Sequence, residues 1–305
     1  AHRMMNVVPP LEITDSKLTS STVAEPYAGE AAWNAAMNYA LGDVVVRPTT
    51  HRKYENLIAG VDAGLPESSP TRWLDVGPTN KYAMFDYDRN SQTTDASPLT
   101  VVITPGTRIG AVLLFGVDAD EAEVDVSVAA VSQYNRVVDL LARGTTTWSE
   151  YFFGAFRYRP TVALLDLPML AGAVITITLR RASGNVSCGA VIMGIPVQVG
   201  LTQYGAENDL IDYSQITRDA FGNATLVRRK TVPKVTLTVW LDALAVDKVR
   251  KLRDDLTATP AGWCGLSDQD EPYFDSVAVL GIFRRFTVQL AGPRHSLCTI
   301  ELEGL

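Results

Sequence analysis

Hydrophobic and polar positions alternate along much of the chain, which predicts β-strands. Residues 123–128 (EVDVSV) and 174–179 (VITITL) place aliphatic side chains at every second position. A period of two puts successive side chains on opposite faces of a sheet, so each strand has one buried and one wet face. Further short apolar runs, bounded by turn residues, occur at 99–104, 108–116, 161–165 and 190–199. The pattern predicts a mainly β protein with a central β-sandwich.

One segment has the pattern of an amphipathic helix. Asp242 is a suitable N-cap, and Leu244, Val249, Leu252 and Leu256 lie near one face of a helix over 243–256. Strands are expected around it, at 234–240, 276–290 and 296–302. Together these elements predict an α+β, split-barrel-like domain. The alanines of 30–40 also favour a second, short helix there.

The chain is expected to form three blocks. Residues 1–84 are rich in turns and aromatic side chains and predict an N-terminal arm with a small aromatic β module. Residues 85–200 contain the runs of the β-sandwich, and 201–305 form the α+β domain. A length of 305 residues is sufficient for several domains of ordinary size.

Composition excludes several classes of function. The formal net charge is −7 and the pI is near 5.1, which argues against binding of nucleic acid. No apolar run reaches the ~18 residues of a membrane-spanning helix. Cys188, Cys264 and Cys298 are widely spaced in apolar surroundings, so we expect buried thiols of a protein made in a reducing compartment.

The sequence contains no recognisable catalytic or metal-binding motif. None of the three histidines has a second one at the spacing of metal ligands, and the Gly-x-Ser-x-Gly and phosphate-loop motifs are absent. Acidic clusters occur at Asp86/Asp88, at Asp118/Asp120/Glu121 and at 268–271, where polar loops favour solvated charge. We therefore expect a protein that is not an enzyme and has no cofactor or metal. A polysaccharide-cleaving enzyme would need a carboxylate pair across a groove.

The aromatic residues of the first block follow a characteristic order. They are Trp33, Tyr39, the run Gly42-Asp43-Val44-Val45, Tyr54-Glu55, Gly60, Gly64, Pro66 and Trp73. This order resembles the type-3 chitin-binding (carbohydrate-binding) modules. The resemblance implies a tiny sheet stabilised by aromatic side chains, with Trp33, Tyr39, Tyr54 and Trp73 as candidate sugar-binding residues. The family binds sugar through aromatics just after the Tyr-Glu pair, where this chain has Leu57, Ile58 and Ala59.

A second resemblance lies in the last block. It is carried by the runs Ile211-Asp212-Tyr213-Ser214, 219–229 (DAFGNATLVRR), Ala258-Thr259-Pro260 with Trp263, and 297–305 (LCTIELEGL). These resemble the C-terminal domain of tail and baseplate proteins of long-tailed bacteriophages, and the run 77–86 (GPTNKYAMFD) strengthens the resemblance. We expect Trp240 and Trp263 to be buried in this domain.

The phage resemblance implies a structural virion protein made in the host cytoplasm. Such a distal-tail-like protein would form a homomeric ring, a trimer or a hexamer, that joins the tail tube to the hub or fibres. Candidate assembly residues lie in a turn, in an expected edge strand over 234–240 and in the C-terminal strand; they are Phe221, Gly222, Asn223, Val235, Leu237, Val239, Ile300 and Leu302. The alternative is a receptor-binding protein that holds host-surface polysaccharide through the aromatic module.

Overall fold

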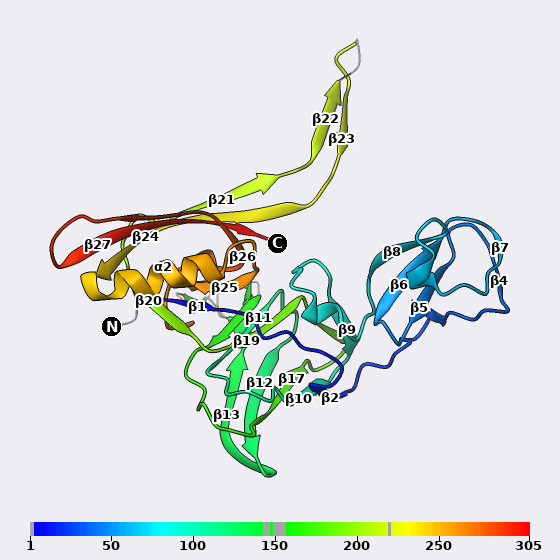
Figure 1. The fold of residues 1–305 in the computed structure, drawn as a ribbon, viewed down its shortest axis with the longest axis horizontal. Helices are drawn as coiled ribbons and strands as arrows, with labels where there is room; N and C mark the ends of the chain where they lie inside the picture. Colours follow the sequence, from blue (N-terminus) through cyan, green and yellow to red (C-terminus); the bar gives the residue numbers. More distant parts are fainter. Residues whose placement is uncertain (1–2, 143–146, 149–156, 219–220) are drawn as a thin grey trace.

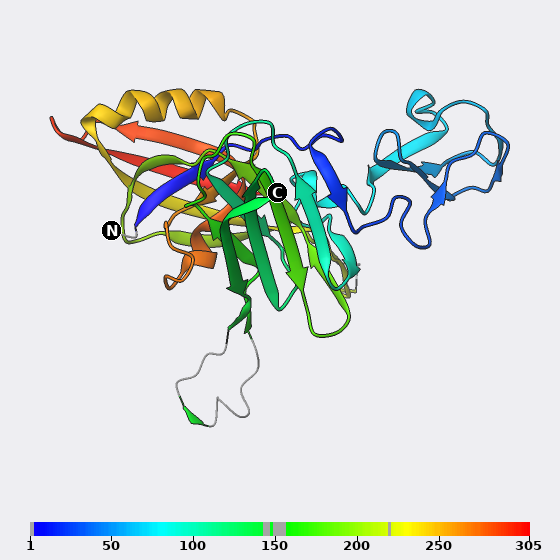
Figure 2. The same cartoon turned by 90° about the horizontal axis from the view of Figure 1, so that it is seen from below.

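The computed structural model describes residues 3–142, 147–148, 157–218 and 221–305. In this part of the chain the protein is mainly β, as predicted, and it contains one substantial helix. Figure 1 shows a barrel carrying the helix, a β-sandwich beside it, a small module at the side, and a hairpin that projects away from the rest. The view of Figure 2, from below, shows the same separation of the small module.

The barrel contains strands from both ends of the chain. Its sheet order is β20 (Val197–Thr202), β1 (Met4–Val8), β25 (Ala261–Cys264), β26 (Ala278–Gln289), β27 (His295–Gly304) and β24 (Thr231–Asp242), with β21 (Glu207–Asp212) beyond. Pairing of β20 with β24 closes the first six strands into a ring, with Leu201 opposite Trp240. The expected split-barrel-like domain is therefore completed by strands β1 (residues 4–8) and β20 (residues 197–202), of which residues 4–8 and 197–200 lie outside the block 201–305.

The helix packs its apolar face on this barrel. Residues Ala243–Ala245 form a 3-10 turn and α2 covers Val246–Asp255, while the Asp242 carboxylate accepts a hydrogen bond from the Leu244 amide. Val249, Leu252 and Leu256 are buried in the barrel core. Leu244 is 94% exposed, so its predicted place on the buried face is wrong. It precedes α2, in the 3-10 turn, where the helical period does not apply.

The β-sandwich consists of two sheets. The larger has the order β13 (Val131–Asp139), β12 (Glu121–Val128), β17 (Val174–Arg180), β10 (Leu99–Ile103) and β2 (Leu18–Ser21). The smaller has the order β16 (Thr161–Leu164), β11 (Ala111–Phe115) and β19 (Ala190–Gly194). A short two-stranded sheet pairs β9 (Thr93–Ala96) with β18 (Asn185–Cys188), and another pairs β14 (Leu141–Ala142) with β15 (Arg157–Tyr158). β12 alternates as its sequence predicts, with Ala122, Val124 and Val126 buried.

The smaller sheet joins the sandwich to the barrel because both of its faces are buried. Every residue of β11 is buried. Val112 and Leu114 face the sandwich core, whereas Leu113 and Phe115 join a second cluster with Leu280 of the barrel. Contact here is close: a Cβ on Gly262 would lie 2.2 Å from Leu113 Cδ1. The two domains therefore form one continuous apolar interior.

A small module is inserted into the sandwich rather than placed before it. This insert module (residues 26–78) lies between β2 and β9 and contains β3 (Ala31–Ala32), β4 (Asn38–Tyr39), β5 (Val44–Arg47), β6 (Arg52–Asn56), β7 (Gly60–Val61), a 3-10 turn (Pro66–Ser68) and β8 (Trp73–Pro78). The helix expected at 30–40 is absent. Its residues instead pair as strands, Ala31 with Val45 and Tyr39 with Gly60, so tertiary pairing overrides the helical preference of alanine.

Polar contacts attach the insert module to the sandwich at the point where the chain enters and leaves the module. Glu25 accepts hydrogen bonds from Thr79 Oγ1 at 2.6 Å and lies 3.0 Å from His51 Nδ1. The His51 ring stacks on Tyr82 of a second 3-10 region (Ala83–Phe85 with its cap Tyr82), with centroids 3.8 Å apart. Burial and the neighbouring carboxylate of Asp15 raise the pKa of Tyr82, which keeps its phenol a hydrogen-bond donor. The expected block 1–84 is thus divided among barrel, sandwich and insert module.

All three thiols are buried, and this carries a testable consequence. Burial raises the pKa of Cys188, Cys264 and Cys298 to about 12. Since the thiolate is the reactive form, only about one thiol in ten thousand would be ionised at pH 8. We expect no reaction with Ellman's reagent in the folded protein and three equivalents after denaturation. Rapid reaction of one equivalent without denaturant would contradict this packing.

Candidate functional site

A β-hairpin without a supporting layer is the most exposed feature of the molecule. β21 and β24 continue beyond the barrel into β22 (Gln215–Arg218) and β23 (Ala224–Val227), which pair only with each other among the described residues. All residues of both strands are exposed. Figure 1 shows this protruding hairpin (described residues 213–218 and 221–230) extending from one end of the barrel sheet.

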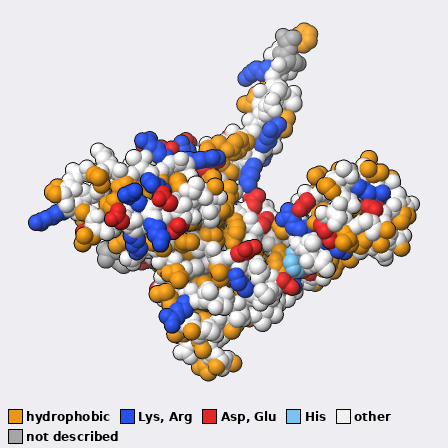
Figure 3. All heavy atoms as spheres, in the orientation of Figure 1, with side chains coloured by type: hydrophobic (Ala, Val, Ile, Leu, Met, Phe, Trp, Pro, Cys, Tyr) orange, Lys and Arg blue, Asp and Glu red, His pale blue; other side chains and the backbone are white. Residues whose placement is uncertain are grey.

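The protruding hairpin carries apolar side chains that are largely exposed among the described residues. Ile216 and Leu226 lie directly opposite each other across the two strands and are 60% and 70% exposed. Leu210, in β21, is 58% exposed. The space-filling view shows hydrophobic and basic side chains along this hairpin (Figure 3). An isolated hairpin is only marginally stable in water, and exposed apolar surface of this kind is typical of an interface.

Three of the candidate assembly residues are exposed in the structure. Phe221, Gly222 and Asn223 form the turn of the protruding hairpin, where Phe221 is 91% exposed. Gly222 has φ +85°, the left-handed conformation that favours glycine. The more central pair, Ile216 and Leu226, was missed. Its available signal was the Gly-Asn turn flanked by two short runs of alternating polarity.

The other candidate assembly residues are not at the surface. Five of them point into the barrel core and are at most 1% exposed: Val235, Leu237, Val239, Ile300 and Leu302. β24 is not an edge strand, because β27 pairs along one side and β20 and β21 along the other. The assignment of these residues to an intersubunit edge is therefore corrected. The missing information was that β1 and β20 close the barrel within one chain.

The aromatic side chains of the insert module form its core. Tyr39, Tyr54 and Trp73 are between 2% and 6% exposed and cluster with Val45. Tyr39 meets Trp73 edge to face with centroids 5.1 Å apart, and Trp73 Nε1 donates to Asp62 at 3.0 Å. Such rings cannot act as platforms for sugar. The placement of these residues as sugar-binding groups is corrected accordingly.

Trp33 is half-buried and its ring is also occupied. The Arg47 guanidinium lies over it, 4.9 Å from the ring centroid. Arg47 is held in turn by two hydrogen bonds to Glu67, and these hydrogen bonds lower the pKa of that carboxyl. At the position where the chitin-binding family has its platform, Leu57 and Ile58 are 39% and 52% exposed. The four aromatic candidates are brought together, but as a structural cluster.

A pocket opens beside the start of β21, on the barrel. It has a volume of about 540 Å³ and is lined mainly by the loop 203–208 and by residues near the short helix α3 (Phe274–Val277). Tyr204 and Tyr273 are each 82% exposed at its mouth, and Leu266 and Val277 contribute to its apolar floor. No sequence motif indicates this pocket, because its residues come from segments that lie far apart in the chain.

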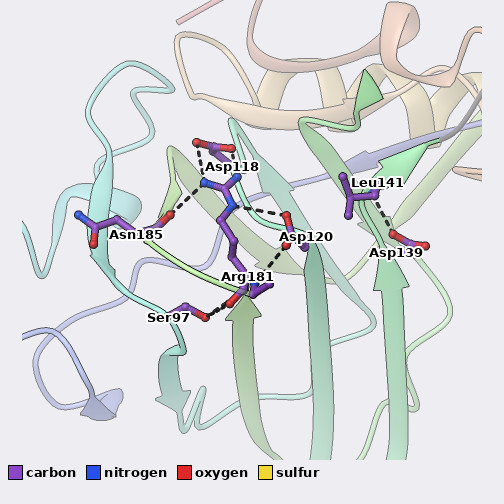
Figure 4. A network of polar contacts seen from close by, with 8 residues as sticks. Ser97, Asp118, Asp120, Asp139, Leu141, Arg181 and Asn185 are labelled. Atoms are coloured by element: carbon purple, nitrogen blue, oxygen red, sulfur yellow. Dashed lines mark hydrogen bonds and ion pairs between the residues drawn. The ribbon is translucent and has the colours of Figure 1, made fainter. Parts of the chain in front are cut away.

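The acidic cluster at 118–121 is neutralised by an arginine. Arg181 forms ion pairs with Asp118 and Asp120, and its guanidinium also donates to the Asn185 carbonyl at 3.0 Å (Figure 4). Its own amide and carbonyl are bonded to Ser97. These contacts fasten the ends of β17 and β12 to β18 and the loop before β10. They indicate a structural clamp.

Removal of this clamp should cost stability without changing assembly. We expect Arg181→Ala to lower the free energy of unfolding by about 1–2 kcal/mol, because several charge-assisted hydrogen bonds are lost. The neighbouring Arg180→Ala, which removes only a pair with the partly exposed Glu123, serves as control and should change it by less than about 0.5 kcal/mol. Denaturant unfolding of the two variants gives the comparison; equal effects would contradict the clamp.

Acidic side chains of the other two clusters also form ion pairs with basic residues of the same chain. Asp88 pairs with Lys230 at the base of the protruding hairpin, at 3.0 Å. Burial opposes ionisation of Asp88, but hydrogen bonds from Asn90 and Lys230 outweigh it and lower its pKa. Asp270 pairs with Arg159 at 2.7 Å. Within the described ranges, no group of three His, Cys, Asp or Glu side chains is placed to hold a metal ion.

Comparisons with known proteins return no relative: no family model, no curated protein and no solved structure matches the chain. In the part of the chain that the structure describes, no helix has the length and apolar character needed to cross a bilayer.

Proposed function

We propose that this protein is a structural virion component of a phage tail tip or baseplate, assembled as a homomeric ring of three or six copies. The ring would connect the tail tube to the hub or fibres. The observation that carries the proposal is the protruding hairpin, with Ile216 and Leu226 exposed on one face. A surface of this kind is stable when another chain covers it.

The arrangement of the domains supports a scaffold. An apolar interior runs from the barrel through the smaller sheet into the sandwich, so the hairpin projects from a stiff body. A projecting element that docks on a different face of the next copy makes a heterologous contact, and such contacts close into rings when the rotation permits. The sequence resemblance to phage tail proteins supplies the setting, assembly in the virion after synthesis in the host cytoplasm.

The receptor-binding alternative has less support. It depends on exposed aromatic rings, and Tyr39, Tyr54 and Trp73 lie in the core of the insert module. The insert module instead exposes aliphatic side chains, among them Met37, Leu41, Ile58 and Val61. Aliphatic groups lack the flat faces that stack on sugar rings, so a protein contact suits this surface better.

Electron microscopy tests the proposed function. We expect closed rings of three or six copies in images of the purified protein, and rings bound at one end of purified tail tubes. Binding to tubes is measured by co-sedimentation, with an unrelated protein of the same mass as control. A protein that forms no rings and stays in the supernatant with tubes would overturn the proposal.

A further inference from the structure

The pocket beside β21 offers a surface that matches the protruding hairpin in chemistry. Its apolar floor and the two exposed tyrosines at its mouth provide a place for aliphatic side chains. A volume of about 540 Å³ accommodates a few side chains of the size of leucine or phenylalanine. The hairpin supplies such side chains at Ile216 and Leu226.

The charges of the two surfaces are complementary. The protruding hairpin contains four basic residues, Arg218, Arg228, Arg229 and Lys230, and one acidic residue, Asp219. Lys230 pairs with Asp88, and Arg229 donates to Gln215 Oε1 at 3.3 Å on the same hairpin, whereas Arg218 and Arg228 form no ion pair among the described residues. The pocket is lined by Glu207 and Glu271, neither of which forms an ion pair within the described chain. Among the described residues that line the pocket, Arg3 is the one cation, and its guanidinium lies over the Tyr204 ring, 3.5 Å from the ring centroid.

The hairpin of one chain cannot reach the pocket of the same chain. Glu207 begins β21 and lines the pocket, and the strand runs away from it toward Ile216. Nine extended residues separate Glu207 from Ile216, which is roughly 30 Å at the rise of a β-strand. Figure 1 shows the two strands continuing outward without turning back. The occupant must therefore come from another molecule.

We infer that the pocket lined by Tyr204, Tyr273, Glu207 and Glu271 receives the protruding hairpin of a neighbouring copy of this chain. Ile216 and Leu226 pack on the apolar floor, while the hairpin arginines meet Glu207 and Glu271. The contact is heterologous, since each copy gives a hairpin and receives one. This inference rests on the proposed function and names the partner of its hairpin.

Two variants with complementary defects test the inference. The first lacks residues 214–229, replaced by Asn-Gly, and keeps its pocket. The second, Ala206→Trp, places an indole at the pocket and keeps its hairpin. We expect each variant alone to be monomeric, and an equimolar mixture to form a 1:1 dimer in light scattering, slightly lighter than twice 33.1 kDa because one partner lacks the hairpin. Ala182→Trp, which fills the cavity beside Arg181, is the matched control and should assemble like wild type.

The outcomes separate the inference from the proposed function. If Ala206→Trp still forms rings, the hairpin docks elsewhere and the inference is overturned, while the ring itself stands. If the wild type is monomeric with and without tail tubes, the proposed function fails as well. A charge test adds an independent readout. Glu271→Arg should weaken assembly at least tenfold, and the double variant that carries Arg228→Glu in the same chain should assemble again. Failure of that rescue together with an intact 1:1 dimer would place Arg228 outside the contact and overturn its assigned pairing.

Discussion

Replacing Ile216 and Leu226 by serine should convert the assembled protein into monomers. The two side chains lie opposite each other on one face of the protruding hairpin and are largely exposed in the single chain. If a neighbouring copy buries them, their loss should cost roughly 2–4 kcal/mol of association free energy, which weakens the dissociation constant about 30- to 1000-fold. Light scattering over a concentration series measures this shift.

The opposite face of the same hairpin provides the control. Thr217 and Thr225 are also paired across the two strands, and alternation places them away from Ile216 and Leu226. Replacing both threonines by serine should leave the mass distribution unchanged. Both double variants should retain the denaturation midpoint of wild-type monomer, because the hairpin contributes nothing to the described apolar cores. Equal loss of assembly in the two variants would contradict a one-faced contact.

Trp73→Ala should unfold the insert module while the rest of the protein stays folded. Trp73 is 2% exposed, and its neighbours in the cluster are few. Truncation of a buried tryptophan costs about 3–5 kcal/mol, which equals or exceeds the stability expected of a module of this size. The apolar cores of the barrel and sandwich contain none of the residues of this cluster, so these domains should persist.

Limited proteolysis with mass spectrometry locates this effect. We expect rapid cleavage within residues 26–78 of the Trp73→Ala variant and protection of the barrel. Leu74→Ala is the matched control, since Leu74 is the next residue of the same strand and is 49% exposed. If the insert module of Trp73→Ala resists proteolysis as well as that of Leu74→Ala, the aromatic cluster is not what stabilises the module.

Local pattern was sufficient to predict the main helix and most strands of the two sandwich sheets, but not β2 or β13. In β12 and β17 the period of two matches burial because each has one face in the sandwich core. The helix followed from Asp242 as N-cap and from the buried Val249 and Leu252. Both kinds of element are determined by residues that are close together in the sequence, so the sequence alone was sufficient to predict them.

Long-range pairing could not be predicted in the same way. Met4–Val8 lies between β20 and β25, some two hundred residues away or more, and this placement makes the barrel closed. Without this long-range pairing, β24 was predicted to be an edge strand. Its side chains Val235, Leu237 and Val239, which are buried in the structure, were therefore predicted to lie at an interface. The candidate site was predicted only at the hairpin turn, because a turn has a local signature and a pocket assembled from segments far apart in the chain has none.

The mass of the wild-type protein in solution tests the central claim most directly. Light scattering across a wide concentration range, with and without purified tail-tube protein, should give three or six times 33.1 kDa, or a shift to that ring when the tube is added. A constant mass of one chain under every condition would contradict the assembly of this protein as a ring.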